Sequence, residues 1–324
     1  MPKHQFLYLS SHEVASAGVE MPEIIDALEI AFAEHGRGNV EMPPKPGVHS
    51  RPDAFIHAMP AYIPALDSIG VKWVSGYPQN QDRGLPYITG LLVLNDADTG
   101  LPLAVMDCTW ITAKRTGAAT ALAAKYLARP DAETLGVLGC GVQGRSNLEA
   151  LRVLFPLTRV VAYDHRLRNA LSFADEVEDK YGLEVRIAQN PREAVTGCDL
   201  VVTAGPILRT PHATIQPGWL DEGAFASLVD FDSYWHPAAM AETDKFCTDD
   251  IPQLEHYRDI GYFQNIPPIH ASLGELVTGQ KNGRESSSER TMACNLGLAL
   301  DDMATAPLVL RNAKARGLGT WLEL

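Results

Sequence analysis

The sequence predicts an α/β protein in which a doubly wound parallel sheet follows an N-terminal α+β part. Three observations support this fold class. Apolar runs alternate with helix-like segments from about residue 134 onward, whereas short apolar runs divided by Pro, Gly and Asn fill residues 40–107. A glycine-rich loop joins the first apolar run of the alternating part to the helix-like segment that follows. The 324 residues are enough for two domains with separate cores.

The N-terminal part is expected to begin with an amphipathic helix and to continue as strands. The helix starts near Pro22 and ends at Gly36, because apolar residues recur between them at helical spacing. Residues 70–74 and 89–94 have the length and composition of strands, and residues 95–100 have the composition of a turn. This helix is interpreted as part of the core.

The rest of the chain is predicted to alternate between strands and helices. Ile111–Arg129 is alanine-rich and stops before Pro130, as a helix would. Strand and helix candidates then follow in this order: 134–138, 143–154, 158–163, 167–181, 183–188, 191–197, 199–204 and 224–230. A last long helix is expected from about Ser288, with Leu296 and Met303 on its apolar face. Such alternation indicates a parallel sheet covered on both faces.

The loop Gly139–Gly144 has the spacing of a dinucleotide-binding Rossmann turn. An apolar run precedes it, a helix-like segment follows, and Asp164 lies 20 residues beyond the third glycine. Gly139 would permit the tight turn, Gly141 would let backbone N–H groups approach a pyrophosphate, and Gly144 would let helix and strand pack closely. Asp164 would bind a ribose. The alternative is a tight glycine turn that binds no ligand.

Composition and charge exclude several other classes. The net charge of -13 argues against binding to nucleic acid or to anionic membranes, because both require clustered cations. The five cysteines are widely spread without a C-x-x-C pair, which favours a reduced, cytoplasmic protein. No signal-like N-terminus or run of about 18 apolar residues is found. The ten histidines lack ligand spacing, so no metal site is expected.

Four polar residues are candidates for chemistry. Lys72 is a single cation in an apolar run, where strand alternation points it away from both apolar neighbours, either to solvent or to a site. Arg115 is either a surface residue or a residue that binds an anion by two parallel hydrogen bonds. Asp230 and Asp232 follow an apolar run, at the kind of strand end where α/β enzymes gather functional groups. Either acid could instead cap a helix that begins near Pro237.

Short motifs in a fixed order extend over most of the chain. They are Met59-Pro60-Ala61, Lys72-Trp73-Val74, Pro78-Gln79-Asn80, Thr99-Gly100-Leu101-Pro102, Ile111 to Ala119, Gly139 to Gln143, Gly274-Glu275-Leu276, Gly283-Arg284-Glu285-Ser286 and Gly297 to Asp302. In these motifs the chain resembles the ornithine cyclodeaminase and mu-crystallin family. The Arg115-Thr116 segment, with the glycine loop about two dozen residues later, is the most specific match.

The resemblance implies a homodimer with two domains. Residues 1–125 would form the substrate-binding and dimerisation domain, with residues 300–324 packing back on it, and residues 126–299 would form the Rossmann domain that binds NAD(P). Members of the family move a hydride between nicotinamide and the α-carbon of a small amino or imino acid. Mu-crystallins show that the same fold also serves as a binding protein.

The resemblance also implies roles for individual residues. Lys72 would contact substrate and take part in catalysis, Arg115 would lie near the substrate carboxylate and the cofactor phosphate, and Asp232 would assist the amine or water. Cofactor contacts would come from Arg115, Thr116, Gly139, Gly141, Val142, Gln143, Gly144, Asp164, Val229 and Asn295.

Three positions depart from the family pattern. Lys45 stands after the Pro43-Pro44 pair, where relatives often have an arginine that grips the substrate carboxylate, so we expect Lys45 to bind substrate without a planar fork. Asp230 replaces a glycine, and a second carboxylate would perturb the pKa of Asp232. His236 replaces a lysine found in many relatives. These changes make a standard ornithine cyclodeaminase the weaker interpretation.

Three functions remain open from the sequence. The first is an imine reductase or amino-acid dehydrogenase, including one for a dicarboxylic imine such as iminosuccinate; a basic run of Lys45, His49, Arg51 and His57 would bind the second carboxylate or be an exposed loop. The second is a cyclodeaminase that acts on a diamino acid such as ornithine. The third is a mu-crystallin-like binding protein. Asp164 favours NAD(H), because it would repel a 2′-phosphate, while Arg166 and Arg168 leave NADP(H) open.

Overall fold

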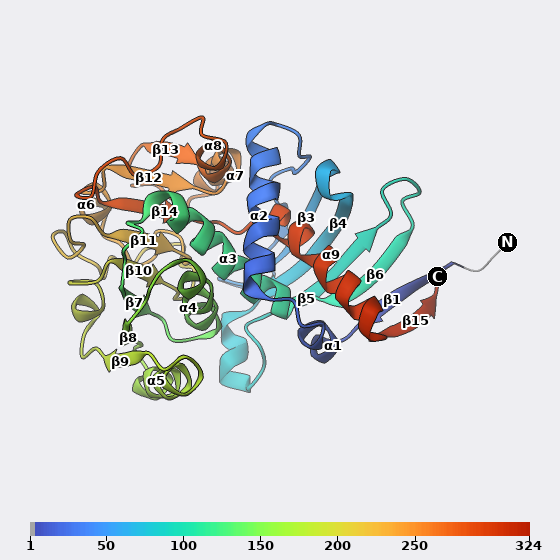
Figure 1. Cartoon of the computed structure of the whole chain (residues 1–324), viewed down its shortest axis with the longest axis horizontal. Coiled ribbons are helices and arrows are strands. Elements are labelled where there is room, and N and C mark those ends of the chain that lie inside the picture. Colours follow the sequence, from blue (N-terminus) through green and yellow to red (C-terminus); the bar gives the residue numbers. More distant parts are fainter. Residues whose placement is uncertain (1–3) are drawn as a thin grey trace. The chain divides into compact units, whose positions relative to one another are not determined.

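The computed structural model describes residues 4–324, apart from the side chain of Gln81, and divides into two compact units (Figure 1). Unit 1 comprises the chain up to Arg115 together with Leu298–Leu324, and unit 2 comprises Thr116–Gly297. The sequence placed the divisions at residues 125/126 and 299/300. The first difference arises because helix α3 (Thr109–Leu127) continues through the division, so no break in the sequence pattern marks it.

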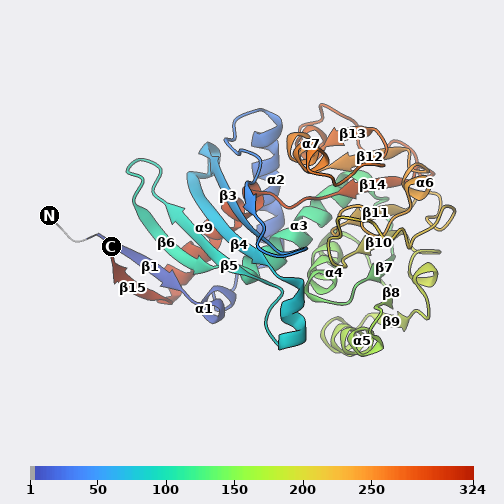
Figure 2. The ribbon, with the colours of Figure 1, turned by 180° about the vertical axis from the view of Figure 1, so that it is seen from behind.

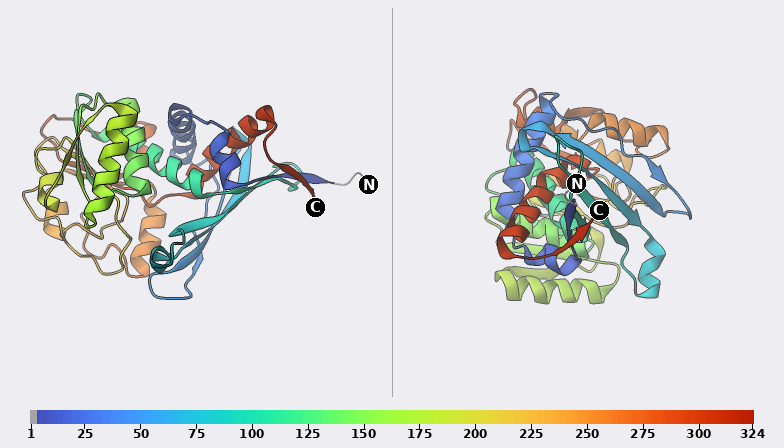
Figure 3. Two further views of the ribbon diagram at one scale, coloured as in Figure 1. Left: turned by 90° about the horizontal axis from the view of Figure 1, so that it is seen from below. Right: turned by 90° about the vertical axis from the view of Figure 1, so that its right-hand side faces the viewer.

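Unit 1 is built on a seven-stranded sheet with the strand order β15-β1-β6-β5-β4-β3-β2 (Figure 2). Its strands are β1 (Gln5–Leu9), β2 (Gly47–Val48), β3 (Phe55–Ile63), β4 (Ser68–Gly76), β5 (Ile88–Asn95), β6 (Pro102–Asp107) and β15 (Thr320–Glu323). The pair β1 and β6 is parallel, and the other pairs are antiparallel. Because β15 pairs with β1, the C-terminal end of the chain lies beside β1 (Figure 3). The strands predicted at residues 70–74 and 89–94 lie within β4 and β5.

Helices cover one face of this sheet. They are α1 (Ser11–Ser16), α2 (Met21–Gly36) and α9 (Ala299–Arg316), with the 3₁₀ helices η1 (Pro64–Leu66) and η2 (Pro78–Arg83) in the connections. The predicted helix near residues 22–36 is confirmed as α2, and its Ile24, Leu28 and Phe32 are buried. Helix α9 packs against α2, β3 and β4. It therefore lies inside the unit, where nearly all its first half is buried.

Unit 2 is built on an eight-stranded sheet in which all pairs are parallel. In sheet order the strands are β13 (Ile269–Ser272), β12 (Lys245–Thr248), β14 (Thr291–Cys294), β11 (Phe225–Leu228), β10 (Leu200–Thr203), β7 (Thr134–Leu138), β8 (Arg159–Tyr163) and β9 (Glu184–Ile187). Chain order runs outward from β7 to β9 and then resumes on the other side at β10. This reversal is the topological switch point at which nucleotide-binding sheets hold their ligand.

The helices of unit 2 connect these strands. Besides the second half of α3 they are α4 (Val142–Leu154), α5 (Leu167–Tyr181), α6 (Pro237–Met240), α7 (Ile251–Asp259) and α8 (Leu273–Val277). The segment expected as a helix at residues 191–197 is only the 3₁₀ turn η3 (Pro191–Ala194). The helix cannot continue because Gly197 takes a left-handed φ of 78° at its end.

The long helix expected from about Ser288 was wrong at its start. Thr291–Cys294 forms strand β14 between β11 and β12, and α9 begins only at Ala299. All four residues of β14 are buried, and a short apolar run buried on every side has no periodicity that separates strand from helix.

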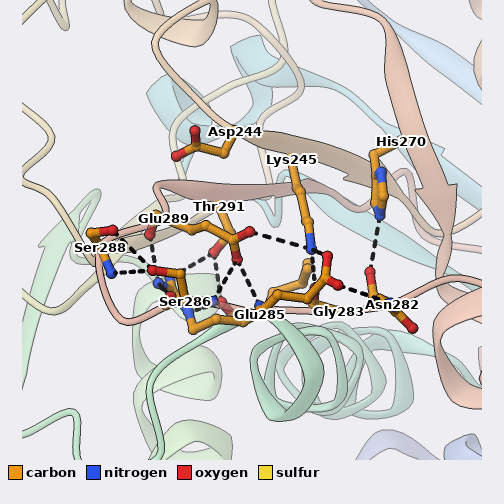
Figure 4. Close-up of polar contacts among 12 residues, drawn as sticks. Asp244, Lys245, His270, Asn282, Gly283, Glu285, Ser286, Ser288, Glu289 and Thr291 are labelled. Carbon is orange, nitrogen blue, oxygen red and sulfur yellow. Dashed lines mark hydrogen bonds and ion pairs between the residues drawn. The ribbon is translucent and has the colours of Figure 1, made fainter.

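A polar cluster at the amino ends of β12 and β14 holds the loop between α8 and β14 in place (Figure 4). The Lys245 ammonium donates to the Glu285 carboxylate at 2.6 Å and to the Gly283 carbonyl, and it pairs with Glu289 at 3.4 Å. Arg284 donates to the Leu127 carbonyl at 2.7 Å and to three further backbone carbonyls. The cluster lies at the opposite ends of the strands from the glycine loop, so its contribution is structural.

Candidate functional site

Lys72 lies in the middle of β4 and points into unit 1. Its side chain is 0% exposed, whereas the neighbouring Trp73 is 51% exposed. The Lys72 ammonium lies 2.6 Å from Asp302 Oδ2 and 3.4 Å from the Thr112 hydroxyl. Strand alternation therefore directs the lysine inward, and the alternative of a solvent-facing lysine is wrong.

Arg115 joins the same buried cluster from α3. Its Nη1 lies 3.1 Å from Asp301 Oδ2, and its Nε lies 3.4 Å from Asp302 Oδ1. Asp301 and Asp302 form the first turn of α9, and both are fully buried. The Asp302 carboxylate is paired with both Lys72 and Arg115. Unit 1 thus encloses two cations and two carboxylates whose charges are balanced largely by ion pairing.

Burial shifts the protonation equilibria of this cluster toward neutral forms. Desolvation, together with the positive charge of Arg115, lowers the pKa of Lys72, although Asp302 opposes the shift. Desolvation raises the pKa of Asp301 to about 6, against the effect of Arg115. Ionisable groups whose pKa values are shifted in this way collect at functional sites.

The two aspartates were not predicted as site residues. Acidic residues in the first turn of a helix ordinarily have a sufficient explanation in the helix dipole. The available signal was an adjacent acidic pair, Asp301-Asp302, in an otherwise apolar stretch of the predicted last helix. This acidic pair indicates a site only if the helix is buried, and the sequence around the pair does not show whether it is.

Lys45 lies in unit 1, in the loop before β2, and its side chain is buried. The adjacent Pro46 carbonyl accepts a hydrogen bond from the Ala58 amide at 3.0 Å, which attaches the loop to β3. Ala58 is followed by Met59, the residue paired with Lys72 across the sheet. The loop of Lys45 is therefore held one residue from the partner of Lys72.

The glycine loop of unit 2 has the conformation that nucleotide binding requires. Gly139 has a φ of 104°, and a Cβ at this position would lie 2.6 Å from the Ala204 carbonyl oxygen. A Cβ at Gly144 would overlap the Gly139 carbonyl. No atom lies within 4 Å of a Cβ built at Gly141, the N-cap residue of α4. The first and third glycines are thus needed for packing, and the second leaves open space at a helix N-terminus, where an anion is stabilised.

Asp164 follows β8 and holds this loop. Its Oδ2 accepts a hydrogen bond from the Cys140 amide at 3.0 Å, and its Oδ1 accepts one from the Arg166 amide at 2.9 Å. Arg166 and Arg168 are exposed at the start of α5. The carboxylate is therefore fixed at the carboxyl end of the sheet, with two cations nearby in the chain.

Asp230 and Asp232 follow the carboxyl end of β11, and both are buried. Asp230 accepts hydrogen bonds from the Thr203 hydroxyl at 2.6 Å and the Gly205 amide at 2.8 Å, and burial raises its pKa to about 7. Burial also raises the pKa of Asp232, whose Oδ1 accepts no hydrogen bond from the described residues. The two acids thus differ: Asp230 is held by donors, while Asp232 has an oxygen available for a ligand.

The alternative that either acid caps the next helix is wrong. His236 caps α6, because its Nδ1 accepts a hydrogen bond from the Ala238 amide at 3.1 Å. Between the two acids, Phe231 has a left-handed φ of 61°, which is rare for a bulky residue. Its ring is held against Phe263 and Tyr257, with centroids 4.8 and 5.1 Å away. Packing therefore maintains a strained backbone at the strand end, as functional sites often require.

The residues present in unit 2 fit a nicotinamide dinucleotide. Buried polar atoms without a hydrogen-bond partner among residues 4–324 include Gln143 Oε1, Asp232 Oδ1 and both side-chain amide atoms of Asn295. These residues follow β7, β11 and β14 at the carboxyl edge of the sheet. Such atoms are costly to leave unpaired, and a nucleotide offers hydroxyl, amide and phosphate partners. Two further residues were predicted to contact the cofactor. Thr116 is buried and Val229 is half-buried in the same unit.

The parallel sheet, the glycine loop and these unsatisfied groups define a dinucleotide-dependent oxidoreductase. The chain belongs to the ornithine cyclodeaminase/mu-crystallin family, whose model matches residues 6–317. The resemblance inferred from the sequence motifs is thereby confirmed, as is the predicted fold class of a Rossmann sheet with a second α+β domain.

Similar proteins span the whole chain. It is 37% identical to the alanine dehydrogenase of Archaeoglobus fulgidus, with 98% of each chain covered. The solved structure of an archaeal alanine dehydrogenase dimer with bound NAD is 34% identical to this chain and has a TM-score of 0.88. The match covers 99% of this chain and 100% of that chain. The Thermococcus litoralis Δ1-pyrroline-2-carboxylate reductase, in complex with NADH and L-proline, is 34% identical with a TM-score of 0.87, covering 97% and 99%.

These relatives establish the enzyme class. They are nicotinamide-dependent oxidoreductases of amino and imino acids, as the sequence predicted, and a lysine cyclodeaminase 28% identical to this chain shows that cyclodeaminases share the fold. In the part of the chain that the structure describes, no helix has both the length and the apolar composition needed to span a membrane.

Proposed function

We propose that this protein is an NAD(H)-dependent dehydrogenase or imine reductase for a small α-amino or α-imino acid. The observation that carries the proposal is the fully buried Lys72 beside Arg115 and two carboxylates in unit 1. Enclosing these charges costs free energy that packing alone does not require. Relatives named for alanine and for Δ1-pyrroline-2-carboxylate support a compact substrate with one carboxylate.

In the proposed reaction Arg115 binds the substrate carboxylate through its planar guanidinium, and Lys45 supplies a second positive charge. Lys72, whose pKa is lowered by burial, donates a proton to the substrate or orients it. Asp232 stabilises the iminium cation and takes up or releases the amine proton through its unpaired oxygen. A nicotinamide held at the glycine loop would supply or accept the hydride. In the reductive direction the imine gains this hydride and one proton.

Two features of unit 2 support the further choices within this proposal. Asp164 is fixed at the end of β8, where a carboxylate favours an unphosphorylated ribose, and the solved relatives contain NAD or NADH. His236 stands where many relatives have a lysine and caps α6 through its Nδ1, and this departure favours a dehydrogenase or reductase over a standard ornithine cyclodeaminase. A cytoplasmic location is part of the same proposal, supported by five free thiols without pairing.

A spectrophotometric screen tests the function. NADH oxidation would be followed with pyruvate plus ammonia, Δ1-pyrroline-2-carboxylate and iminosuccinate, and repeated with NADPH. We expect stoichiometric NADH consumption with at least one single-carboxylate substrate and a lower kcat/KM with NADPH. Release of ammonia from ornithine or lysine without net NADH turnover would instead identify a cyclodeaminase. Tight NADH binding without turnover of any substrate would support a mu-crystallin-like binding protein.

We also propose that the protein is a homodimer formed through the outer face of the unit 1 sheet. Trp73 and Leu91 are register partners on β4 and β5, and both are about half exposed on the face opposite Lys72. Tyr8 on β1 is a further exposed aromatic residue in this sheet. An apolar sheet face of this kind is ordinarily covered by a partner.

Light scattering on a sizing column tests this assembly. We expect the wild-type chain to have the mass of a dimer and Trp73→Glu to have the mass of a monomer, because the buried interface would acquire an unpaired charge. Leu171→Glu, at an exposed apolar position on α5, is the matched control and should remain dimeric. A monomeric wild-type protein, or a Trp73→Glu variant that stays dimeric, would refute this interface.

A further inference from the structure

Unit 1 contains a cavity of about 290 Å³ that none of the proposed catalytic groups lines. It lies between the loop before β3 and the 3₁₀ helix η2 that follows β4. Its lining includes Ser50, Arg51, Tyr77, Asn80 and Arg83. This volume is enough for a small metabolite.

The lining is cationic and rich in hydrogen-bond donors. Arg51 and Arg83 both face the cavity, and neither forms an ion pair with a carboxylate in the described part of the chain. The Arg51 guanidinium donates to the Ser50 carbonyl at 2.6 Å, which leaves further N–H groups for a ligand. No aspartate or glutamate lines the cavity, although the chain as a whole carries a net charge of -13.

Hydrogen bonds hold the walls in place. The Ser50 and Tyr77 hydroxyls lie 2.7 Å apart, which joins the loop before β3 to the end of β4. The Asn80 side chain donates to the Pro86 carbonyl at 2.9 Å and fixes η2 to the segment that enters β5. The two arginines are therefore presented from segments that are tied to the sheet.

We propose that this cavity is a binding site for a small oxyanion-bearing metabolite, a carboxylate or a phosphate. Two unpaired guanidiniums with amide and hydroxyl donors are the groups that recognise planar carboxylates and phosphates. The site is separate from the amino-acid cluster. Tyr77 is five residues beyond Lys72 and directly follows the end of β4, a separation of about 17 Å at the rise of a β-strand. A molecule of amino-acid size bound at Lys72 does not reach it.

Isothermal titration at constant ionic strength tests the site with two probes, inorganic phosphate and citrate. We expect at least one probe to bind the wild-type protein, and Arg51→Gln or Arg83→Gln to weaken that binding at least tenfold. Arg51→Lys, which keeps the charge but loses the planar fork, should weaken it less. Arg311→Gln, an exposed arginine paired with Glu23 elsewhere in unit 1, is the matched control and should bind as the wild type does.

The outcome with each probe also identifies the ligand class. Binding of phosphate alone indicates a phosphorylated metabolite, and binding of citrate alone indicates a polycarboxylate. The proposal is overturned if neither probe binds, or if binding survives in the Arg51→Gln/Arg83→Gln double variant. It is equally overturned if Lys72→Met abolishes binding, because the anion would then occupy the amino-acid cluster. None of these results depends on whether the protein turns over an amino acid.

Discussion

Two buried lysines, one in each unit, stand in different electrostatic surroundings. Lys245 donates to the Glu285 carboxylate and the Gly283 carbonyl and pairs with Glu289, and its Glu285 partner is largely exposed to water. Lys72 has Asp302 and the Thr112 hydroxyl as its partners, and the Asp302 side chain is fully buried. Both lysines are buried and paired, but only Lys72 has a carboxylate partner that is itself fully buried.

The difference separates a structural cluster from a functional one. Hydrogen bonding to Lys245 lowers the pKa of Glu285, as expected for a stabilising pair. Burial lowers the pKa of Lys72 and raises that of Asp301, so the unit 1 cluster holds its charges at a cost. Shifts of this kind collect where a protein needs to exchange protons or bind a charged substrate. The burial and the pKa shifts of the partner carboxylates thus indicate the role of a buried lysine better than the number of its ion pairs does.

The largest expected effect comes from removing the two lysines in turn. Lys72→Met should lower kcat/KM about 10²- to 10³-fold, because a charge positioned for the transition state is lost. Lys245→Met should leave kcat/KM within about twofold and lower the free energy of unfolding by about 1–3 kcal/mol. Steady-state kinetics and urea denaturation measure the two quantities. Equal losses of activity in both variants would remove the distinction between the clusters.

A double variant separates chemistry from folding at Lys72. Lys72→Met leaves the Asp302 charge uncompensated, so its unfolding free energy should fall by about 3–5 kcal/mol. Lys72→Met/Asp302→Asn removes both charges and should recover most of that stability without recovering activity. Recovery of activity together with stability would show that Lys72 acts only through the fold.

An intermediate effect is expected from replacing the two arginines by lysine. Arg115→Lys should raise KM about 10- to 100-fold with a smaller change in kcat, because the planar fork for the substrate carboxylate is lost. Arg284→Lys, in the unit 2 cluster, should leave KM unchanged and cost about 1–3 kcal/mol of stability, since Arg284 donates to several backbone carbonyls. A raised KM in Arg284→Lys would contradict its structural assignment.

The smallest effect is a pH dependence of opposite sign in the two clusters. The folded pKa of Asp301 is raised from 3.8 to about 6, so its stabilising contribution is present below pH 3.8 and is lost as pH rises through about 6. The stability advantage of the wild type over Asp301→Asn should therefore shrink between pH 4 and 6, by about 1.4 kcal/mol per pH unit at most.

Glu285 should show the reverse dependence. Its folded pKa is lowered from 4.5, so its contribution is present above pH 4.5 and is lost as pH falls through the folded pKa. The advantage of the wild type over Glu285→Gln should grow as pH rises from about 3 to 5. Urea denaturation across this range checks both variants. Parallel pH dependences would mean that the two clusters are electrostatically alike.

The sequence predicted the elements of unit 2 from β7 to β11, apart from η3, to within a residue or two. The helix predicted at residues 167–181 and the strand predicted at 134–138 have those bounds in the structure. Apart from a helix near Pro237, no element was predicted between β11 and Ser288, where α6, β12, α7, β13 and α8 lie, and two further segments were assigned wrongly. The buried run Thr291–Cys294 has no periodicity of its own, and the turn at Pro191–Ala194 is too short for the helical pattern assigned to it.

The candidate site was predictable in part. Gly139, Gly141, Gly144 and Asp164 form a motif whose spacing follows from the covalent chain, and their arrangement is recognisable without tertiary information. The alternatives at Asp230 and Asp232 were not separable by sequence, because capping and catalysis use the same side chain at the same strand end. Only the contact of His236 with the Ala238 amide decided between them.

By itself, the sequence determined the fold class, the dinucleotide loop and the family, because these depend on periodicity and on residue spacing within short stretches. The tertiary structure decided which charges are enclosed together. Lys72, Arg115 and Asp302 come from β4, α3 and α9. In chain order, α9 follows the whole of unit 2, so Asp302 is far in sequence from the two cations that it contacts. Burial and pKa depend on such distant packing, so the meaning of these residues is a property of the folded chain.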